Sequence, residues 1–88
     1  MRIVFMGSPE FAVPSLEQIQ LSDHQIIAII TGEDKRRGRG NELSPTPVKA
    51  SALNYGLPVH SFEKMKDPEL HQLLTELNPD LIVIVAFK

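Results

Sequence analysis

The sequence predicts an α/β domain built on a parallel, doubly wound sheet. Three short apolar runs do not alternate with polar residues, so both faces of each strand are expected to be covered, as in parallel sheets. Segments with helix-start signals lie between the runs, and such alternation implies right-handed crossovers. We expect a partial Rossmann-like sheet of about four strands in the order 3-2-1-4, with three helices. The runs are RIVFM at Arg2–Met6, QIIAII at Gln25–Ile30 and LIVIVA at Leu81–Ala86.

The first strand is followed by Gly7-Ser8-Pro9, where dinucleotide-binding folds carry their phosphate loop. The G-x-G-x-x-G pattern is absent and Pro9 removes a backbone donor, so the residues argue against an NAD or FAD site. Pro14 would interrupt a helix that began at Pro9. We therefore expect a turn over Pro9–Val13, a helix from Pro14 to about Leu21, and Ser8 as a turn or helix cap.

The second helix is expected over Pro47–Tyr55, because Thr46 can cap its start and Gly56 is typical of a helix end. A shorter strand candidate, Val59–Ser61, follows Pro58.

The third helix, Asp67–Leu77, has the clearest signals. Asp67 can cap it, Pro68 fits its first position, and Asn78-Pro79 ends it. His71 lies opposite the apolar stripe and is expected to be solvated. The stripe consists of leucines at i, i+3, i+4 and i+7, namely Leu70, Leu73, Leu74 and Leu77.

The run Thr31–Lys49 is the most informative connection, because loops in compact domains usually need only about four to six residues. It holds four cations within five positions, and arginine forks and lysine heads suit phosphates, which points to a nucleic acid. The competing interpretation is a solvated loop without a ligand, since three nearby carboxylates offset much of its charge. The cations are Lys35, Arg36, Arg37 and Arg39, and the carboxylates are Glu33, Asp34 and Glu42.

The length, net charge and residue composition limit the possible classes of function. Eighty-eight residues make one domain at most, or a piece of one, and the net charge of −2 confines any polyanion contact to the basic run. The chain has no cysteine, and its three histidines lack metal-ligand spacing, so we expect no disulfide and no metal site. No carboxylate pair or nucleophile–base set is apparent, so no catalytic residue is assigned. The start resembles neither a signal peptide nor a membrane span, and a cytoplasmic protein is expected.

Several segments together resemble methionyl-tRNA formyltransferases over nearly the whole chain. The family's order and spacing are kept by MRIVFMGSPEFAVPSL at the start, GRG at Gly38–Gly40, SPTPVK at Ser44–Lys49, GLPV at Gly56–Val59 and NPDLIVIVAF at Asn78–Phe87. Formyltransferases that act on sugar nucleotides share the opening strand and the Asn-Pro-Asp-Leu strand.

This resemblance implies formyl transfer from 10-formyltetrahydrofolate to the amino group of methionine on initiator tRNA. Arg39 looks like the loop arginine that helps to place the acceptor stem. Lys35, Arg36 and Arg37 would add phosphate attraction, and Phe11 looks like the aromatic that lies against the methionyl side chain. The family usually has lysines at Asn41 and Glu42, so the phosphate contacts here are expected to be shifted or weaker.

The family's catalytic Asn, His and Asp and its Ser-Leu-Leu-Pro folate motif follow the fourth strand. We therefore interpret residues 1–88 as the N-terminal part of the formyltransferase catalytic domain, itself inactive. The alternatives are a formyltransferase acting on a sugar nucleotide and a non-catalytic module that binds a phosphorylated ligand. An uncovered strand edge at Leu81–Val85 is expected to make the isolated piece self-associate.

Overall fold

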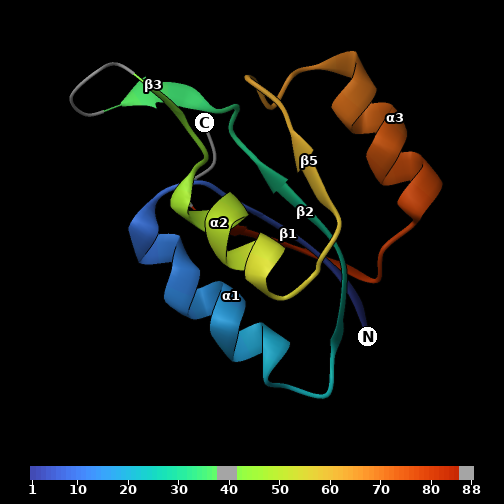
Figure 1. The fold of residues 1–88 in the computed structure, drawn as a ribbon. Coiled ribbons are helices and arrows are strands. Elements are labelled where there is room, and N and C mark those ends of the chain that lie inside the picture. Colours follow the sequence, from blue (N-terminus) through green and yellow to red (C-terminus); the bar gives the residue numbers. More distant parts are fainter. Residues whose placement is uncertain (38–41, 86–88) are drawn as a thin grey trace.

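The structure is a computed structural model, and it describes residues 1–37 and 42–85. Its main sheet has four parallel strands in the order β5-β2-β1-β6 (Figure 1). These are the third, second, first and fourth of the predicted strands, so the predicted order 3-2-1-4 is confirmed. The bounds are Arg2–Gly7 for β1, Gln25–Thr31 for β2, Val59–Ser61 for β5 and Leu81–Val85 for β6.

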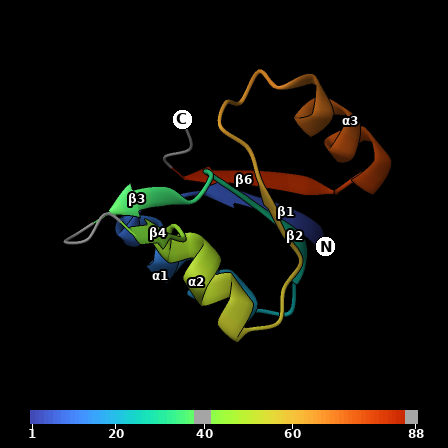
Figure 2. The same ribbon diagram turned by 45° about the horizontal axis from the view of Figure 1, so that its top comes forward.

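Helices cover both faces of this sheet. The helices α1 and α2 lie on one face and α3 lies on the other (Figure 2). The chain moves outward from β1 to β2 and β5 and then returns to β6, so right-handed crossovers place the helices on opposite faces. The bounds are Val13–Gln20 for α1, Pro47–Asn54 for α2 and Pro68–Leu77 for α3, and a 3₁₀ turn, η1, spans Glu10–Ala12.

The predicted helix signals act as the sequence suggests. Thr46 Oγ1 accepts the backbone N–H of Lys49 at 3.1 Å, and Asp67 Oδ1 accepts that of Glu69 at 2.9 Å. Asn78 ends α3 in the left-handed conformation with φ 46°. The first helix begins at Val13, one residue before the predicted Pro14, because Pro14 fits the first turn of a helix, where no backbone donor is needed.

Alternate residues of β1 enter two separate cores. Phe5 packs with Leu16 in the cluster under α1 and α2, whereas Val4 and Met6 pack with Leu70 in the cluster under α3. Because all of these side chains are almost fully buried, both faces of β1 are covered, as predicted. In β2 the pairing with β1 skips Ile27, so Ile26 and Ala28, two residues apart, lie on opposite faces of the sheet. Ile26 packs in the cluster under α1 and α2, and Ala28 packs in the cluster under α3.

The last strand departs from the prediction that both of its faces are covered. Val83 and Val85 pack against the α1/α2 core. On the other face, Ile82 and Ile84 are 38% and 53% exposed. Helix α3 therefore covers β1 and β2 on its side but leaves much of β6 uncovered.

Polar contacts fix the start of β1 to α3 and β6. The Arg2 guanidinium donates to the carbonyls of Leu77 and Asn78, both at 2.9 Å, where a cation complements the helix C-terminus. The backbone N–H of Arg2 donates to Asp80 Oδ2 at 2.7 Å. Among residues 1–37 and 42–85, no helix is long and apolar enough to cross a membrane.

Candidate functional site

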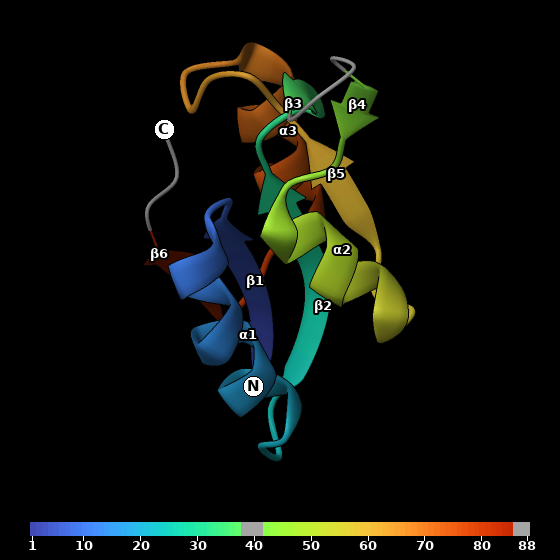
Figure 3. The ribbon, with the colours of Figure 1, turned by 60° about the vertical axis from the view of Figure 1, so that its left-hand side comes forward.

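The carboxyl ends of the four parallel strands define the candidate site. Gly7 at the end of β1 pairs with Val85 at the end of β6, and Thr31 at the end of β2 pairs with Ser61 of β5. Ligands of doubly wound sheets bind beyond this edge, where the chain reverses its direction across the sheet. Here the reversal lies between β1 and β6. Figure 3 shows that two short strands after β2, β3 (Lys35–Arg37) and β4 (Glu42–Ser44), lie at the same end of the molecule as these strand ends.

The turn after β1 is held close to β6. A Cβ added at Gly7 would lie 2.7 Å from the carbonyl oxygen of Val85 and 3.3 Å from the Cβ of Ala12. This position therefore has room for the hydrogen atom of glycine but not for a larger side chain. Ala12 is fully buried and anchors η1. Phe11, the predicted substrate contact, lies beside it with 69% of its surface exposed. The structure thus presents an uncovered aromatic ring next to the strand ends.

The prediction that Ser8 caps the turn or the first helix is wrong. No side-chain cap is made at the start of η1 or α1. Instead, Ser8 Oγ accepts the backbone N–H of Gly32 at 2.9 Å, and its carbonyl accepts that of Val48 at 3.4 Å. Because its partners lie after β2 and in α2, Ser8 ties the first turn to the next two elements.

The basic run is not the continuous loop that the sequence predicts. Lys35–Arg37 form strand β3, which pairs antiparallel with β4, Glu42–Ser44. We call these two strands the basic hairpin. Three of the predicted cations, Lys35, Arg36 and Arg37, are therefore on a strand, whereas Arg39 lies outside the described residues.

One carboxylate near the basic hairpin already has a cation partner. Lys49 Nζ lies 3.0 Å from Asp34 Oδ1 and 3.2 Å from Oδ2, so it connects α2 to the residue before β3. Both side chains are partly exposed, at 26% and 37%, and such a pair contributes little to stability. Its charges nevertheless cancel locally, so Asp34 offsets less of the charge of the basic hairpin than the sequence suggested.

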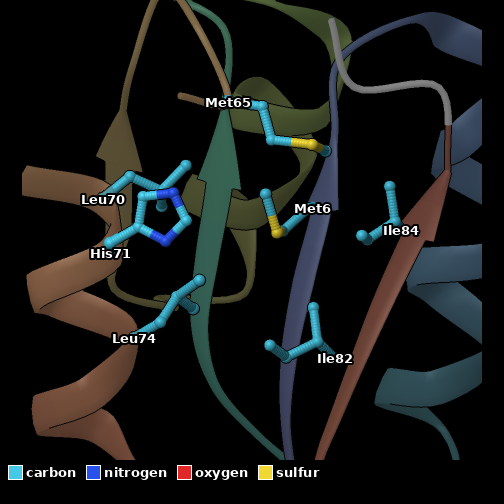
Figure 4. Close-up of a pocket in the computed structure, with 7 residues that line it drawn as sticks. All are labelled: Met6, Met65, Leu70, His71, Leu74, Ile82 and Ile84. Atoms are coloured by element: carbon cyan, nitrogen blue, oxygen red, sulfur yellow. The ribbon is translucent and has the colours of Figure 1, made fainter. Parts of the chain in front are cut away.

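A shallow apolar hollow of about 180 Å³ lies on the other face, between α3 and β6 (Figure 4). Leu70 and Leu74 line it from the helix, and Ile82 and Ile84 line it from the strand. His71 is exposed, as predicted, but it also borders this hollow. The lining offers hydrophobic contact and one imidazole, and the hollow continues onto the uncovered face of β6.

Two buried threonines lie in contact near the strand ends; Thr46 was predicted as a helix cap, whereas Thr31 was missed by the sequence analysis. Thr31 and Thr46 are 0% and 2% exposed, and their Oγ1 atoms lie 2.5 Å apart. Thr31 ends an apolar strand, and a polar residue at that place was the available signal. In the part of the chain that the structure describes, no group of three or more metal-ligating side chains gathers.

The sheet order and the strand-end geometry are those of a doubly wound α/β protein. Comparison with known sequences identifies the family. The formyl transferase family model matches residues 1–88. A methionyl-tRNA formyltransferase of Moorella thermoacetica is 53% identical over 87 residues, and one of Caldanaerobacter subterraneus subsp. tengcongensis is 50% identical over 88. Each alignment covers 99% of this chain and 28% of the relative. The chain belongs to the formyl transferase family.

A solved structure shows the same fold. Phosphoribosylglycinamide formyltransferase from Anaplasma phagocytophilum superposes with a TM-score of 0.65 over 99% of this chain and 39% of that one, at 17% identity. At this identity the likeness concerns the fold alone. The predicted Rossmann-like sheet and the predicted family are both confirmed.

Proposed function

We propose that residues 1–88 form the N-terminal part of the catalytic domain of a methionyl-tRNA formyltransferase. The enzyme would transfer the formyl group of 10-formyltetrahydrofolate to the amino group of methionine on initiator tRNA, in the cytoplasm. The observation that carries this proposal is the 53% identity, over 99% of this chain, to a relative named for that activity. We assign no residue among 1–88 to the folate donor, and none to a metal.

Two parts of the candidate site are assigned to the methionyl-tRNA. Phe11 would lie against the methionyl side chain, which is supported by its 69% exposure beside the strand ends. Lys35, Arg36 and Arg37 of β3, with Arg39 beyond it, would bind the acceptor stem, since cations of this kind attract phosphates. The hairpin begins just after β2, so both parts are connected to the same edge of the sheet.

The 88-residue chain by itself is expected to be inactive. In formyl transfer, the methionyl nitrogen bonds to the formyl carbon, the bond from that carbon to the folate nitrogen breaks, and a proton passes from the amine to the folate nitrogen. A base and an oxyanion donor are needed for these steps. Because the chain spans 28% of the relatives that it matches, we assign those groups to sequence beyond residue 88.

The isolated chain is expected to self-associate, with a second copy of itself as the partner. In the described sheet, β6 pairs with β1 on one edge only, and an open edge of this kind is a template for another strand. Ile82 and Ile84 add exposed apolar surface beside that edge. Analytical ultracentrifugation of the 88-residue chain should show dimers or larger species, and a stable monomer in dilute solution would refute this assignment.

An acceptor comparison tests the proposed function. The reading frame would be extended to the length of the relatives, and the product would be supplied with 10-formyltetrahydrofolate. We expect formylation of methionyl-tRNA by the extended protein and none by the 88-residue chain. Preference for an amino-sugar nucleotide would establish the alternative formyltransferase instead. Binding of phosphorylated ligands without transfer to either acceptor would establish a non-catalytic module.

A further inference from the structure

We propose that the hydroxyls of Ser8, Thr31 and Thr46 form a chain of hydrogen bonds that holds the basic hairpin in place against the turn carrying Phe11. We call these three residues the hydroxyl chain. Thr31, at its centre, is then a positioning residue for the partner that the hairpin binds. The consequence for tRNA rests on the proposed function, whereas the hydroxyl chain itself is a property of the fold and is tested separately.

The hydroxyl chain joins the two roots of the basic hairpin. The polypeptide leaves the sheet at Thr31 and Gly32 and returns at Thr46, just before α2. Thr31 and Thr46 contact each other through their hydroxyl oxygens. Ser8 Oγ contacts both the hydroxyl of Thr31, at 3.4 Å, and the backbone N–H of Gly32. The turn after β1 and both hairpin roots thus meet at one point.

Donor accounting gives the hydroxyl chain a direction. Thr46 Oγ1 already accepts the Lys49 N–H as the cap of α2, so its single proton is available for Thr31. Thr31 then donates its own proton to Ser8 Oγ, which also accepts from Gly32. In this order both buried threonine protons have acceptors. Because these threonines are almost completely buried, water does not replace a lost partner.

The basic hairpin needs such support from its roots. A two-stranded hairpin is at best marginally stable on its own, and three-residue strands are short. Leu43, the apolar residue of β4, is 64% exposed, so it does not anchor the hairpin in the core. The Asp34–Lys49 pair lies at the surface and is screened by salt. Among the hairpin and root side chains that the structure describes, the buried ones are therefore those of Thr31 and Thr46 in the hydroxyl chain.

Two substitutions at Thr31 separate hydrogen bonding from packing. Thr31→Val keeps the shape of the side chain and removes the hydroxyl, whereas Thr31→Ser keeps the hydroxyl and removes a methyl group. Limited trypsin digestion of the extended protein reports on hairpin opening, because the peptide bonds after Lys35 and Arg36 lie within β3. We expect cleavage there to be about 3- to 10-fold faster in Thr31→Val than in Thr31→Ser. Equal rates, or faster cleavage in the serine variant, would overturn the proposal.

Cleavage after Lys64 and Lys66, in the exposed segment before α3, provides the internal control. It should be unchanged between the variants, and an equal rise there would show that the hydroxyls support the whole fold and not the hairpin. If Thr31→Val does not fold, Ser8→Ala replaces it, with Ser8→Thr as the variant that keeps the hydroxyl. The same expected result and the same contradicting result apply to that pair.

The consequence for tRNA is measured in the extended protein. Thr31→Val should raise KM for methionyl-tRNA several-fold with little change in KM for the folate donor, and Thr31→Ser should restore it. If the hairpin opens faster but KM for methionyl-tRNA does not change, the hydroxyl chain stands and the assignment of the hairpin to tRNA fails. If KM changes without faster opening, the hydroxyl chain is refuted while the proposed function stands.

Discussion

Replacing Gly7 by alanine is expected to destabilise the edge of the sheet that carries the candidate site. The new Cβ would lie 2.7 Å from the carbonyl oxygen of Val85 and 3.2 Å from the Phe5 ring. Carbon–oxygen contacts of this kind settle at about 3.3–3.6 Å, so the strands would have to separate by roughly 0.6–0.9 Å. The oxygen belongs to the backbone of β6, which pairs with Gly7 itself, and no side-chain rotation relieves the contact.

Overpacking of this kind costs about 1–3 kcal/mol, and we expect the upper half of that range because backbone must move. For a domain of this size, a loss of 2 kcal/mol lowers Tm by roughly 8–16 °C. Thermal and urea unfolding, followed by far-UV circular dichroism, would measure it. Gly56→Ala is the matched control: the added Cβ meets nothing within 4 Å, and the cost arises from φ 69° alone. If Gly7→Ala proved no more destabilising than Gly56→Ala, the close approach of β1 and β6 would be wrong.

Three further predictions test the core, an interhelical contact and the proposed tRNA contact. Leu70→Ala should lower the free energy of unfolding by about 2–4 kcal/mol, because this side chain is 1% exposed. Leu53→Ala, at a position that is 56% exposed, should lower it by under about 1 kcal/mol. Equal losses in urea titrations would contradict the packing of α3. Loss of hydration and the Glu17 carboxylate raise the pKa of Tyr55 above 10.0, and Glu17 Oε2 accepts the Tyr55 hydroxyl at 3.3 Å. The contribution of this contact to the free energy of unfolding should be fully present below about pH 10 and lost as the pH rises through the folded-state pKa. The stability difference between the wild type and Tyr55→Phe should therefore be constant up to about pH 10 and change only above it, and a change near neutral pH would refute the contact. Arg39→Ala in the extended protein should raise KM for methionyl-tRNA about tenfold and leave KM for the folate donor unchanged, which steady-state kinetics would decide; equal effects would contradict the assigned role.

The sheet could be predicted from the sequence because its signals are local and strong. Runs such as QIIAII carry no polar residue after the first, so they indicate a strand that is covered on both faces. Asp67-Pro68 and Gly56 mark helix boundaries through backbone chemistry that holds wherever they lie. The predicted strand order then follows the usual arrangement of doubly wound sheets, and crossover handedness sets the face on which each helix lies. The exposure of Ile82 and Ile84 was missed because a continuous apolar run does not show which of its faces has a neighbour.

The candidate site could be predicted only in part. The family resemblance implied that Phe11 contacts the methionyl side chain, and the structure shows Phe11 exposed in the 3₁₀ turn after β1. The basic hairpin was missed because Lys35–Arg37 has no apolar alternation, and its residues pair with partners five to nine positions further along the chain. The contact between Ser8 and Gly32 joins residues 24 apart in sequence, so no local pattern carries it.

Hydrogen–deuterium exchange of the extended protein, with and without methionyl-tRNA, tests the central claim most directly. If the carboxyl edge of the sheet and the basic hairpin bind the tRNA, added methionyl-tRNA should slow exchange at residues 8–12 and 32–46 and leave α3 unchanged. Slower exchange confined to α3 and β5, with none at Phe11 or the basic hairpin, would contradict the account.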